Sequence, residues 1–361
     1  LSSDGAARGA RSTRSVVDHF EYTAQAVVVT SGGIGHNLEM VREFWPERLG
    51  PPPAAENMVA GVPAYVDGSM LPLVEGAGGR LVNRDRMWHY VEGIENHSPV
   101  WDRHGIRILP GPSSLWLDAA GRRLPAPLYP GFDTLGTLAH LRQTGYDYSW
   151  FILTQAIIEK EFALSGSEQN PDLTGKSIAQ VLGRVRPGAP GPVQRFIDDG
   201  VDFVSADTVE DLVAAMNELS GDRLLEASRI RAMIEARDAE LDNEFGKDAQ
   251  VQLVRATRRY RGDKLIRTAS PHRFLDPEKG PLHAVRLRVL TRKTLGGVQT
   301  DLGSRALGAD GAAVPGLYAA GEVAGFGGGG VHGYRSLEGT FLGGCLFSGR
   351  AAGRTVHTDL G

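Results

Sequence analysis

The feature that most restricts how this chain can fold is a glycine-rich stretch near its C-terminus. Residues 314–353 predict an apolar strand over residues 317–320, a glycine-rich turn, and a helix of small residues. Glu322 follows that strand directly, so it is expected at the carboxyl edge of a parallel sheet, where ligands bind in open α/β folds. A carboxylate there accepts hydrogen bonds from sugar or polyol hydroxyls, and the helix that follows directs free N–H groups at a ligand in front of it. We predict a nucleotide-type site here; a glycine-rich surface loop with a structural acid is the alternative.

Glycine is enriched where this site is expected. The chain has 47 glycines in 361 residues, and nineteen of them lie in residues 295–361. Residues 325–330 formally satisfy G-x-G-x-x-G, but any glycine run does so, and the required strand, turn and helix with a later acid are absent. We therefore reject a dinucleotide phosphate loop at this position.

A second strand is predicted earlier in the chain, over residues 24–30, and it stops at a glycine turn. Aromatic residues then gather in a loop-rich region up to residue 131. Helices are predicted at residues 151–163, after the capping box at 208–211, and at 224–241. The economical interpretation is one discontinuous nucleotide-type domain that carries a large insertion.

Composition excludes several classes of site. The single cysteine, Cys345, rules out internal disulfides and cysteine-based zinc or iron–sulfur centres. Histidines and acids at 89–104 match no zinc spacing, so no metal is expected. No apolar run approaches the roughly 20 residues of a membrane span, and no signal peptide is visible. The net charge of -4 weighs against nucleic acid or an anionic membrane as the main partner. We expect a cytoplasmic protein that acts on a small molecule, with its oligomeric state open.

Four segments carry a family resemblance. In chain order they are AVVVTSGGIGHN, VDGSMLPLVEGAGG, LYAAGEVAG and VHGYRSLEGTFLGG. Together they resemble the fumarate reductase/succinate dehydrogenase flavoprotein family. Within it they look most like actinobacterial FAD-binding dehydrogenases akin to 3-ketosteroid Δ1-dehydrogenases.

The resemblance implies a cofactor and two domains. FAD would lie in a discontinuous α/β Rossmann-like domain formed by residues 1–86 and 284–361. An α+β capping domain at residues 87–283 would close over the flavin. The family opens its FAD domain with a GxGxxG strand–helix unit that this chain lacks, so the FAD domain is expected to be incomplete. Expressed alone, these 361 residues are expected to be colourless or aggregated.

The same resemblance assigns cofactor contacts to eight residues: Ser31, Gly32, Gly33, Gly321, Glu322, Gly339, Thr340 and Phe341. The first three match a turn near the adenosine–ribose end of FAD. The next two match the pair that binds the ribityl chain. The last three match the start of the helix that faces the flavin pyrimidine edge.

Four residues are implied on the substrate side. His89 falls where fumarate reductases carry a histidine of the capping domain, with a buried structural histidine as the alternative. Lys293 replaces their substrate histidine, and Arg335 lies one position from their substrate arginine. Tyr334 instead aligns with the tyrosine of the ketosteroid dehydrogenases' HTYPGPGG motif. Residues 121–127 lack the segment that precedes the fumarate reductases' proton-donor arginine, which counts against a fumarate reductase, whereas Tyr334 favours a ketone-type substrate.

The predicted reaction is dehydrogenation, or reduction, of a CH–CH bond next to a carbonyl or carboxylate, with hydride transfer at flavin N5. It needs a proton-transfer group and a clamp for the developing oxyanion. Tyr334 is the predicted base, with a pKa lowered by Arg335 or Lys293. The predicted clamp is either His89 or the backbone N–H groups near residues 338–340. The alternatives are a non-catalytic flavin-binding remnant and other flavin chemistry, such as dicarboxylate reduction or amine oxidation. The electron partner is not predicted.

Overall fold

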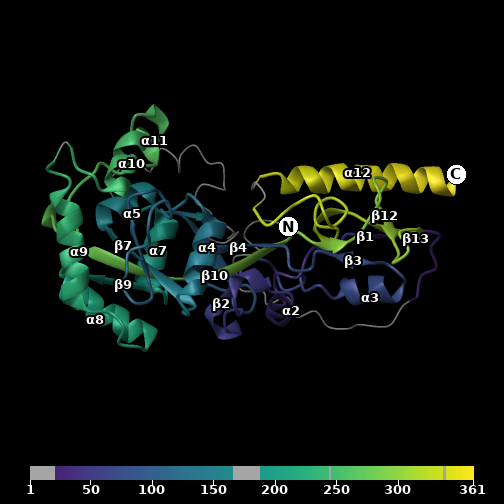
Figure 1. Ribbon diagram of the computed structural model, residues 1–361, viewed down its shortest axis with the longest axis horizontal. Coiled ribbons are helices and arrows are strands. Elements are labelled where there is room, and N and C mark those ends of the chain that lie inside the picture. The colour runs from purple at the N-terminus through teal and green to yellow at the C-terminus, as the bar shows by residue number, and fades with distance from the viewer. Residues whose placement is uncertain (1–20, 166–187, 244, 336–338) are drawn as a thin grey trace.

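The computed structural model describes residues 21–165, 188–243, 245–335 and 339–361. Two lobes lie side by side along the long axis of the molecule (Figure 1). The large lobe is built on an eight-stranded sheet, and the small lobe contains a three-stranded sheet beside the C-terminal helix. One long strand, β10 (Leu282–Thr294), runs from the large lobe to the junction between them.

The sheet of the large lobe is mixed. Its order is β6-β7-β10-β4-β5-β8, and β2 and β9 also pair with β10. The first half of β10 pairs antiparallel with β7 and β9, and its second half pairs with β4 and, in parallel, with β2. Besides β10, the sheet consists of β2 (Met58–Ala60), β4 (Met87–Glu95), β5 (Gly105–Leu109), β6 (Leu115–Asp118), β7 (Tyr148–Thr154), β8 (Ala163–Ser165) and β9 (Phe203–Ala206).

Helices surround this sheet. Thr208 caps α8 by accepting a hydrogen bond from the Asp211 amide at 3.1 Å, as the capping box predicts. The helical elements of the large lobe are α4 (Thr134–Gln143), α5 (Gln155–Glu161), α7 (Gly191–Asp199), α8 (Val209–Ser220), α9 (Ala227–Ala239), α10 (Ala249–Thr257), α11 (Arg261–Ile266) and η3 (Pro277–Lys279).

In the small lobe, β13 pairs in parallel with β1 and antiparallel with β12. A two-stranded ladder of β3 and β11 packs nearby. The elements that precede or belong to this lobe are β1 (Val27–Val29), α2 (Leu38–Glu43), η1 (Glu47–Leu49), η2 (Ala55–Asn57), α3 (Met70–Gly76), β3 (Leu81–Val82), β11 (Gly297–Val298), β12 (Arg305–Leu307), β13 (Ala313–Ala319), η4 (Gly321–Val323) and α12 (Phe341–Leu360).

One sequence prediction for the large lobe is wrong in part. The helix predicted at 151–163 is the end of strand β7 followed by the short helix α5. Residues 150–153 are all fully buried, so both faces of β7 are apolar and the two-residue alternation of a strand is absent. The region predicted to be loop-rich likewise contains β4, β5 and β6.

Strand β1 lies at the edge of the small sheet. Within the described residues it pairs with β13 alone, and Val27 and Val28 are 51% and 42% exposed. An exposed apolar sheet edge favours association with another chain. Within the described part of the chain, no helix combines the length and apolar character needed to cross a membrane.

Candidate active site

Three chain segments meet at Glu322, which follows β13. The Glu322 carboxylate accepts a hydrogen bond from the amide of Thr294, the last residue of β10, at 2.9 Å. The Thr294 hydroxyl in turn accepts from the amide of Ile34 at 3.0 Å. A Cβ added at Gly33 would lie 2.6 Å from Glu322 Oε1, so only glycine fits this turn. The structure therefore brings together the predicted turn at 31–33 and the predicted acid.

Burial raises the pKa of Glu322 to about 7, although the Thr294 amide and the nearby Lys293 and Arg292 oppose the shift. A carboxyl group whose pKa lies near neutral accepts or donates a hydrogen bond according to its protonation state. Such a group, enclosed at the end of a parallel strand, is suited to bind a polyol hydroxyl.

The glycines around this acid allow backbone to pack on backbone. A Cβ at Gly297 would fall on the Val323 carbonyl oxygen, and one at Gly325 would fall on that of Leu295. Gly344 of α12 packs in the same way on the carbonyl of Phe326. Close contacts between backbone segments therefore explain part of the glycine enrichment. Gly339, by contrast, has open space around it.

Helix α12 is held beside Glu322 by a hydrogen bond from the preceding residue, Gly321. The Gly321 amide donates to the Ser348 hydroxyl at 3.0 Å. Phe341, at the start of α12, is buried against the rings of Phe326 and His332, whose centroids lie 4.8 and 5.1 Å away. The first turn of this 20-residue helix thus lies beside an aromatic cluster, and its N-terminus carries partial positive charge.

Lys293 and Trp88 face this cluster from the strands β10 and β4, where they are paired. The Lys293 ammonium lies 4.9 Å from the centre of the Phe341 ring. The Trp88 ring meets Phe341 edge to face, and its indole N–H is buried without a hydrogen-bond partner among the described residues. An unsatisfied donor beside a cation is the kind of feature that a ligand oxygen would complete.

Tyr334 is neutral in this arrangement. Its hydroxyl donates to Asp85, and that hydrogen bond, with burial, raises the tyrosine pKa above its usual value. Arg48 and Arg86 lie over its ring, at 4.3 and 5.6 Å. The prediction that a neighbouring cation lowers this pKa is therefore wrong, because the carboxylate of Asp85 dominates.

Arg335 forms an ion pair with Asp133, which caps α4 of the large lobe. The pair joins the loop before α12 to the large lobe, so Arg335 is engaged away from Tyr334 and does not act on its hydroxyl. Thr340 and Gly339 are exposed at the start of α12, and Ser31 and Gly32 lie in the turn that follows β1.

His89 is a core residue, which matches the buried structural histidine that the sequence left open as the alternative. The imidazole is 3% exposed and stacks on Trp45 at 5.9 Å. Its Nδ1 accepts from the Arg292 amide at 3.2 Å, and its Nε2 lies 3.1 Å from the sulfur of Met87. Burial lowers the pKa of His89 to about 4, so the ring is neutral.

The burial of neutral His89 contributes stability that is lost in acid. Because the folded state binds a proton on His89 more weakly than the unfolded state, this contribution falls as the pH drops from 6.5 to about 4. The loss from this residue is about 3 kcal/mol. In the full-length protein, His89→Asn keeps an acceptor for the Arg292 amide and should remove this loss. Urea unfolding at a series of pH values measures it, and parallel profiles for the two proteins would contradict the assignment.

Sequence reasoning missed Asp85, Trp88, Thr294 and His332 as members of this site. His332 lies next to the predicted Tyr334, and burial lowers its pKa. Among the described residues, no group of three or more histidines, cysteines or acids is arranged to hold a metal ion.

Residues 1–342 match a protein family described as "FAD binding domain". The chain belongs to this FAD-binding family. FAD is accordingly its cofactor, as predicted from the sequence, and the residues described above fit that group. Glu322 would accept hydrogen bonds from the ribityl hydroxyls, with the Gly33 backbone packed directly against its carboxylate. The first turn of α12 is suited to an electron-rich ring edge.

Relatives of known name agree with this assignment. The chain is 61% identical to a "KsdD-like steroid dehydrogenase" of Mycobacterium tuberculosis over 98% of its own length and 62% of that protein. The chain thus spans about three-fifths of this curated relative. Related folds occur in a 3-ketosteroid delta1-dehydrogenase from Sterolibacterium denitrificans and a flavocytochrome c3 fumarate reductase. Their TM-scores are 0.59 and 0.54, with 17% and 19% identity. The match to the ketosteroid dehydrogenase covers 92% of this chain and 53% of that structure. The match to the fumarate reductase covers 93% of this chain and 46% of that structure. The resemblance predicted from the sequence is confirmed.

Proposed function

We propose that the full-length protein is an FAD-dependent oxidoreductase that dehydrogenates, or reduces, a C–C bond next to a carbonyl, with a ketosteroid-like substrate. The observation that carries this proposal is the junction of Gly33, Thr294 and Glu322 in a chain of the FAD-binding family. The cation of Lys293 and the donor of Trp88 lie at the adjoining aromatic cluster, where a substrate oxygen would be bound.

The domain division is part of the proposal. We infer that residues 1–86 and 284–361 form a discontinuous Rossmann-like FAD domain, and that residues 87–283 form the capping domain. The two lobes support this division. The boundary at residue 284 falls within β10, all of which pairs within the sheet of the large lobe, and β2 of the first segment pairs with it there, so these strands link the two parts.

When bound, FAD accepts or donates a hydride at N5. The Lys293 ammonium would stabilise negative charge that develops on the substrate oxygen. Tyr334 would exchange a proton with the substrate carbon next to that oxygen. Because its hydroxyl already donates to Asp85, the phenol oxygen would take the substrate proton while its own proton passes to Asp85. The Tyr334–Asp85 pair then acts as one proton-transfer unit, and no free tyrosinate is required.

Variants of this pair test the assignment. In the full-length enzyme, Tyr334→Phe and Asp85→Asn are each expected to lower turnover by about 10²–10⁴-fold, the usual worth of a general acid–base group. FAD content should be unchanged, because neither residue is among the proposed cofactor contacts. The matched control is Tyr318→Phe, which breaks a second tyrosine–aspartate pair, Tyr318 with Asp359 at 2.7 Å. Equal turnover in Tyr334→Phe and the control would exclude the assigned role.

The experiment that tests the function is anaerobic mixing of full-length holoenzyme with ketosteroids, dicarboxylates and amines, each in turn. Bleaching of the flavin by a ketosteroid alone supports the proposal. Bleaching by an amine would replace the proposed reaction with amine oxidation. Reoxidation of the reduced flavin by a dicarboxylate alone would replace it with dicarboxylate reduction. An FAD-loaded protein that none of these compounds affects, and that chemical reductants do reduce, would be a non-catalytic flavin-binding protein.

A further inference from the structure

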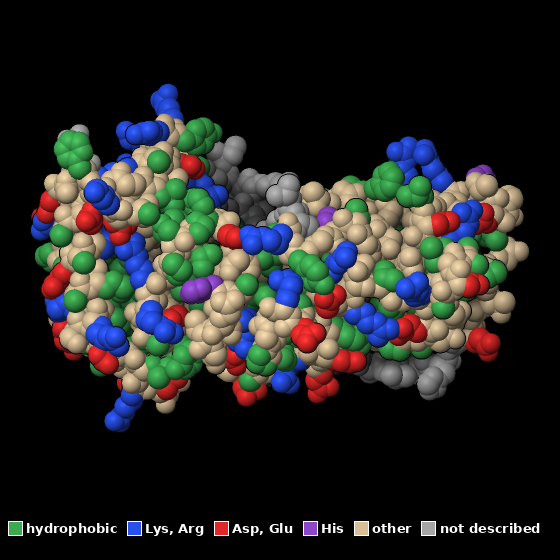
Figure 2. Space-filling view, viewed as in Figure 1, with side chains coloured by type: hydrophobic (Ala, Val, Ile, Leu, Met, Phe, Trp, Pro, Cys, Tyr) green, Lys and Arg blue, Asp and Glu red, His purple; other side chains and the backbone are tan. Residues whose placement is uncertain are grey.

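The edge of the large lobe that carries α10 and α11 has a surface that the proposed reaction does not use. Tyr260 and Leu265 are 70% and 53% exposed there. Basic and apolar side chains stand next to one another at this edge, over α10 and α11 (Figure 2). We call this the tip surface; it consists of the exposed residues Arg259, Tyr260, Arg261, Lys264, Leu265 and Arg267.

The charge of the tip surface is opposite to that of the whole chain. Residues 255–267 contain six Arg or Lys residues and one Asp, a net charge of +5, in a chain of net charge -4. Arg255 and Arg258 turn inward and donate to the carbonyls of Leu241 and Thr268, at 3.0 and 2.5 Å. None of the four basic residues of the tip surface, Arg259, Arg261, Lys264 and Arg267, forms an ion pair with another described residue. Their charge is therefore directed to solvent.

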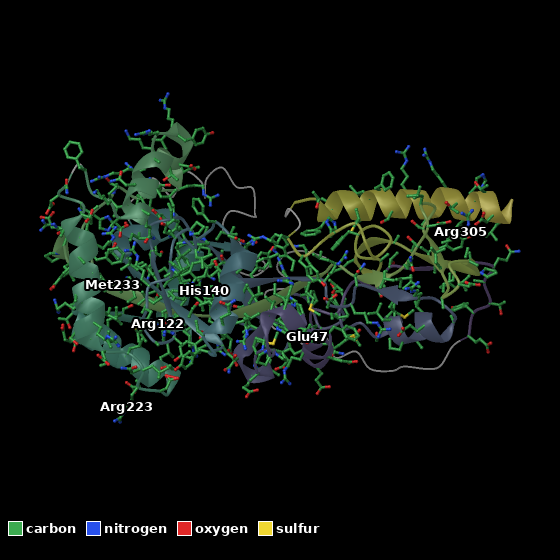
Figure 3. The ribbon with its side chains drawn as sticks, in the orientation of Figure 1. Glu47, Arg122, His140, Arg223, Met233 and Arg305 are labelled. Carbon is green, nitrogen blue, oxygen red and sulfur yellow. The ribbon has the colours of Figure 1, made fainter. Side chains whose placement is uncertain are left out.

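The tip surface lies apart from the candidate active site. α11 projects from the upper edge of the large lobe, whereas the start of α12 lies at the junction of the lobes (Figure 1). Arg305 marks the small lobe at the opposite end of the molecule, and Arg223 marks a different corner of the large lobe (Figure 3). A redox partner would have to approach the flavin site, so the position of the tip surface disfavours that kind of partner.

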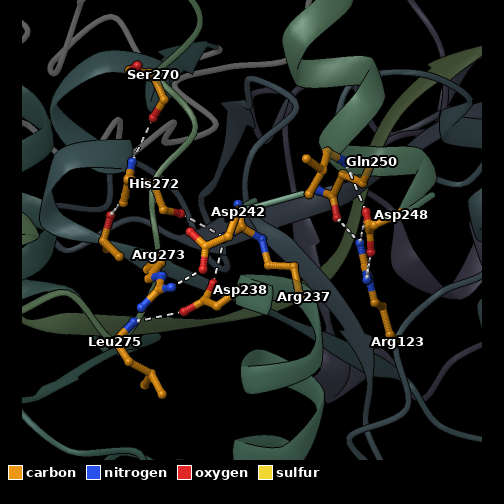
Figure 4. A network of polar contacts seen from close by, with 12 residues as sticks. Arg123, Arg237, Asp238, Asp242, Asp248, Gln250, Ser270, His272, Arg273 and Leu275 are labelled. Atoms are coloured by element: carbon orange, nitrogen blue, oxygen red, sulfur yellow. Dashed lines mark hydrogen bonds and ion pairs between the residues drawn. The ribbon is translucent and has the colours of Figure 1, made fainter. Parts of the chain in front are cut away.

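The tip surface is presented on a firm base. Arg123 holds Asp248, the N-cap of α10, through two hydrogen bonds of 2.5 and 3.1 Å (Figure 4). Gln250 donates to the carbonyls of Pro112 and Ser114, each at 2.7 Å. These contacts fix α10 to the body of the lobe, and α11 follows it after a short turn.

Protruding Tyr and Leu side chains between Arg and Lys are the features with which a peripheral protein binds a lipid surface. The cations meet anionic headgroups, and the apolar side chains enter the headgroup boundary. We propose that the tip surface docks the protein reversibly on an anionic phospholipid bilayer. Each basic residue near such a surface is worth roughly fivefold in affinity. The proposal is independent of the reaction, although it would place the enzyme where apolar, steroid-like molecules partition.

Co-sedimentation of the full-length protein with vesicles tests this proposal. Vesicles of phosphatidylglycerol and phosphatidylcholine in about equal parts should bind the protein, vesicles of phosphatidylcholine alone should not, and added salt should release it. Arg261→Gln/Lys264→Gln is expected to weaken binding at least tenfold. Tyr260→Ser/Leu265→Ser should weaken it at constant charge. The matched control is Arg223→Gln/Arg229→Gln, which removes two exposed charges elsewhere on the large lobe and should leave binding unchanged.

Several results would overturn the proposal. Absence of binding to anionic vesicles at low salt is one, and equal weakening by the tip and control variants is another. Tighter binding of a short DNA duplex or an acidic protein than of anionic vesicles, lost in the same tip variants, would reassign the surface to that partner. Circular dichroism of each variant confirms that it is folded.

Discussion

In the full-length protein, Gly297→Ala is expected to lower the free energy of unfolding by about 2–6 kcal/mol, or to prevent folding. Gly297 has a φ of 138°, a conformation that residues with a side chain rarely adopt. An added Cβ would also fall on the backbone carbonyl of Val323, which cannot move as a flexible side chain can. The strain and the clash add, because each persists if the other is relieved. Since Val323 is adjacent to Glu322, loss of bound FAD should accompany the loss of stability.

Gly343→Ala is the matched control for this prediction. Gly343 lies in α12 and has open space where a Cβ would be added. Alanine there should stabilise the protein by about 0.5–1 kcal/mol, because glycine weakens a helix. Urea unfolding and flavin absorbance of the two variants provide the comparison. Similar stabilities for Gly297→Ala and Gly343→Ala would contradict the assigned backbone packing.

The cofactor half of the site was predictable because its signals are local. A strand followed by the turn at Gly33, and another followed by Glu322, can each be identified within ten residues. Parallel pairing of β1 and β13 then brings the two ends together without further information. The pKa of Glu322 near neutrality could not be predicted, because it depends on how deeply Thr294 and the turn enclose the carboxyl group.

The substrate half was less predictable because it depends on contacts between distant residues. Tyr334 and Asp85 are 249 positions apart, so nothing near Tyr334 in the sequence indicates which charge controls its pKa. His89 occupies a motif position expected to face substrate, yet the alternation of β4 turns it into the core beside Trp45. Strand β7, buried on both faces, shows the same limit for secondary structure, because it lacks a distinguishing period.

Glu322→Ala in the full-length protein is expected to weaken FAD binding by about 10–100-fold, since hydrogen bonds to a charged group contribute about 1.5–3 kcal/mol. Glu322→Gln retains the shape and hydrogen-bonding atoms, so its loss should be smaller. Titration of the apoprotein with FAD, followed by flavin fluorescence, measures both. Undiminished binding in Glu322→Ala would remove this residue from the ribityl site.

Glu322→Gln also has a consequence for the apoprotein that is separable from cofactor binding. The folded state holds a proton on Glu322 with a pKa of about 7, above the ordinary 4.5, so the folded state binds it more tightly than the unfolded chain does. The resulting stability is fully present below pH 4.5 and is lost as the pH rises to about 7, a change of about 3 kcal/mol.

Other buried groups titrate in the same range. Burial also raises the pKa of Glu161 to about 7, so the stability that its proton contributes is lost over the same pH range, while the effect of His89 runs in the opposite direction. Only the difference between Glu322→Gln and the unmodified apoprotein therefore isolates Glu322, and that difference should grow between pH 4.5 and 7 and then level off. A difference that stays constant over this range would show that the carboxyl group is ionised and solvated in the folded apoprotein.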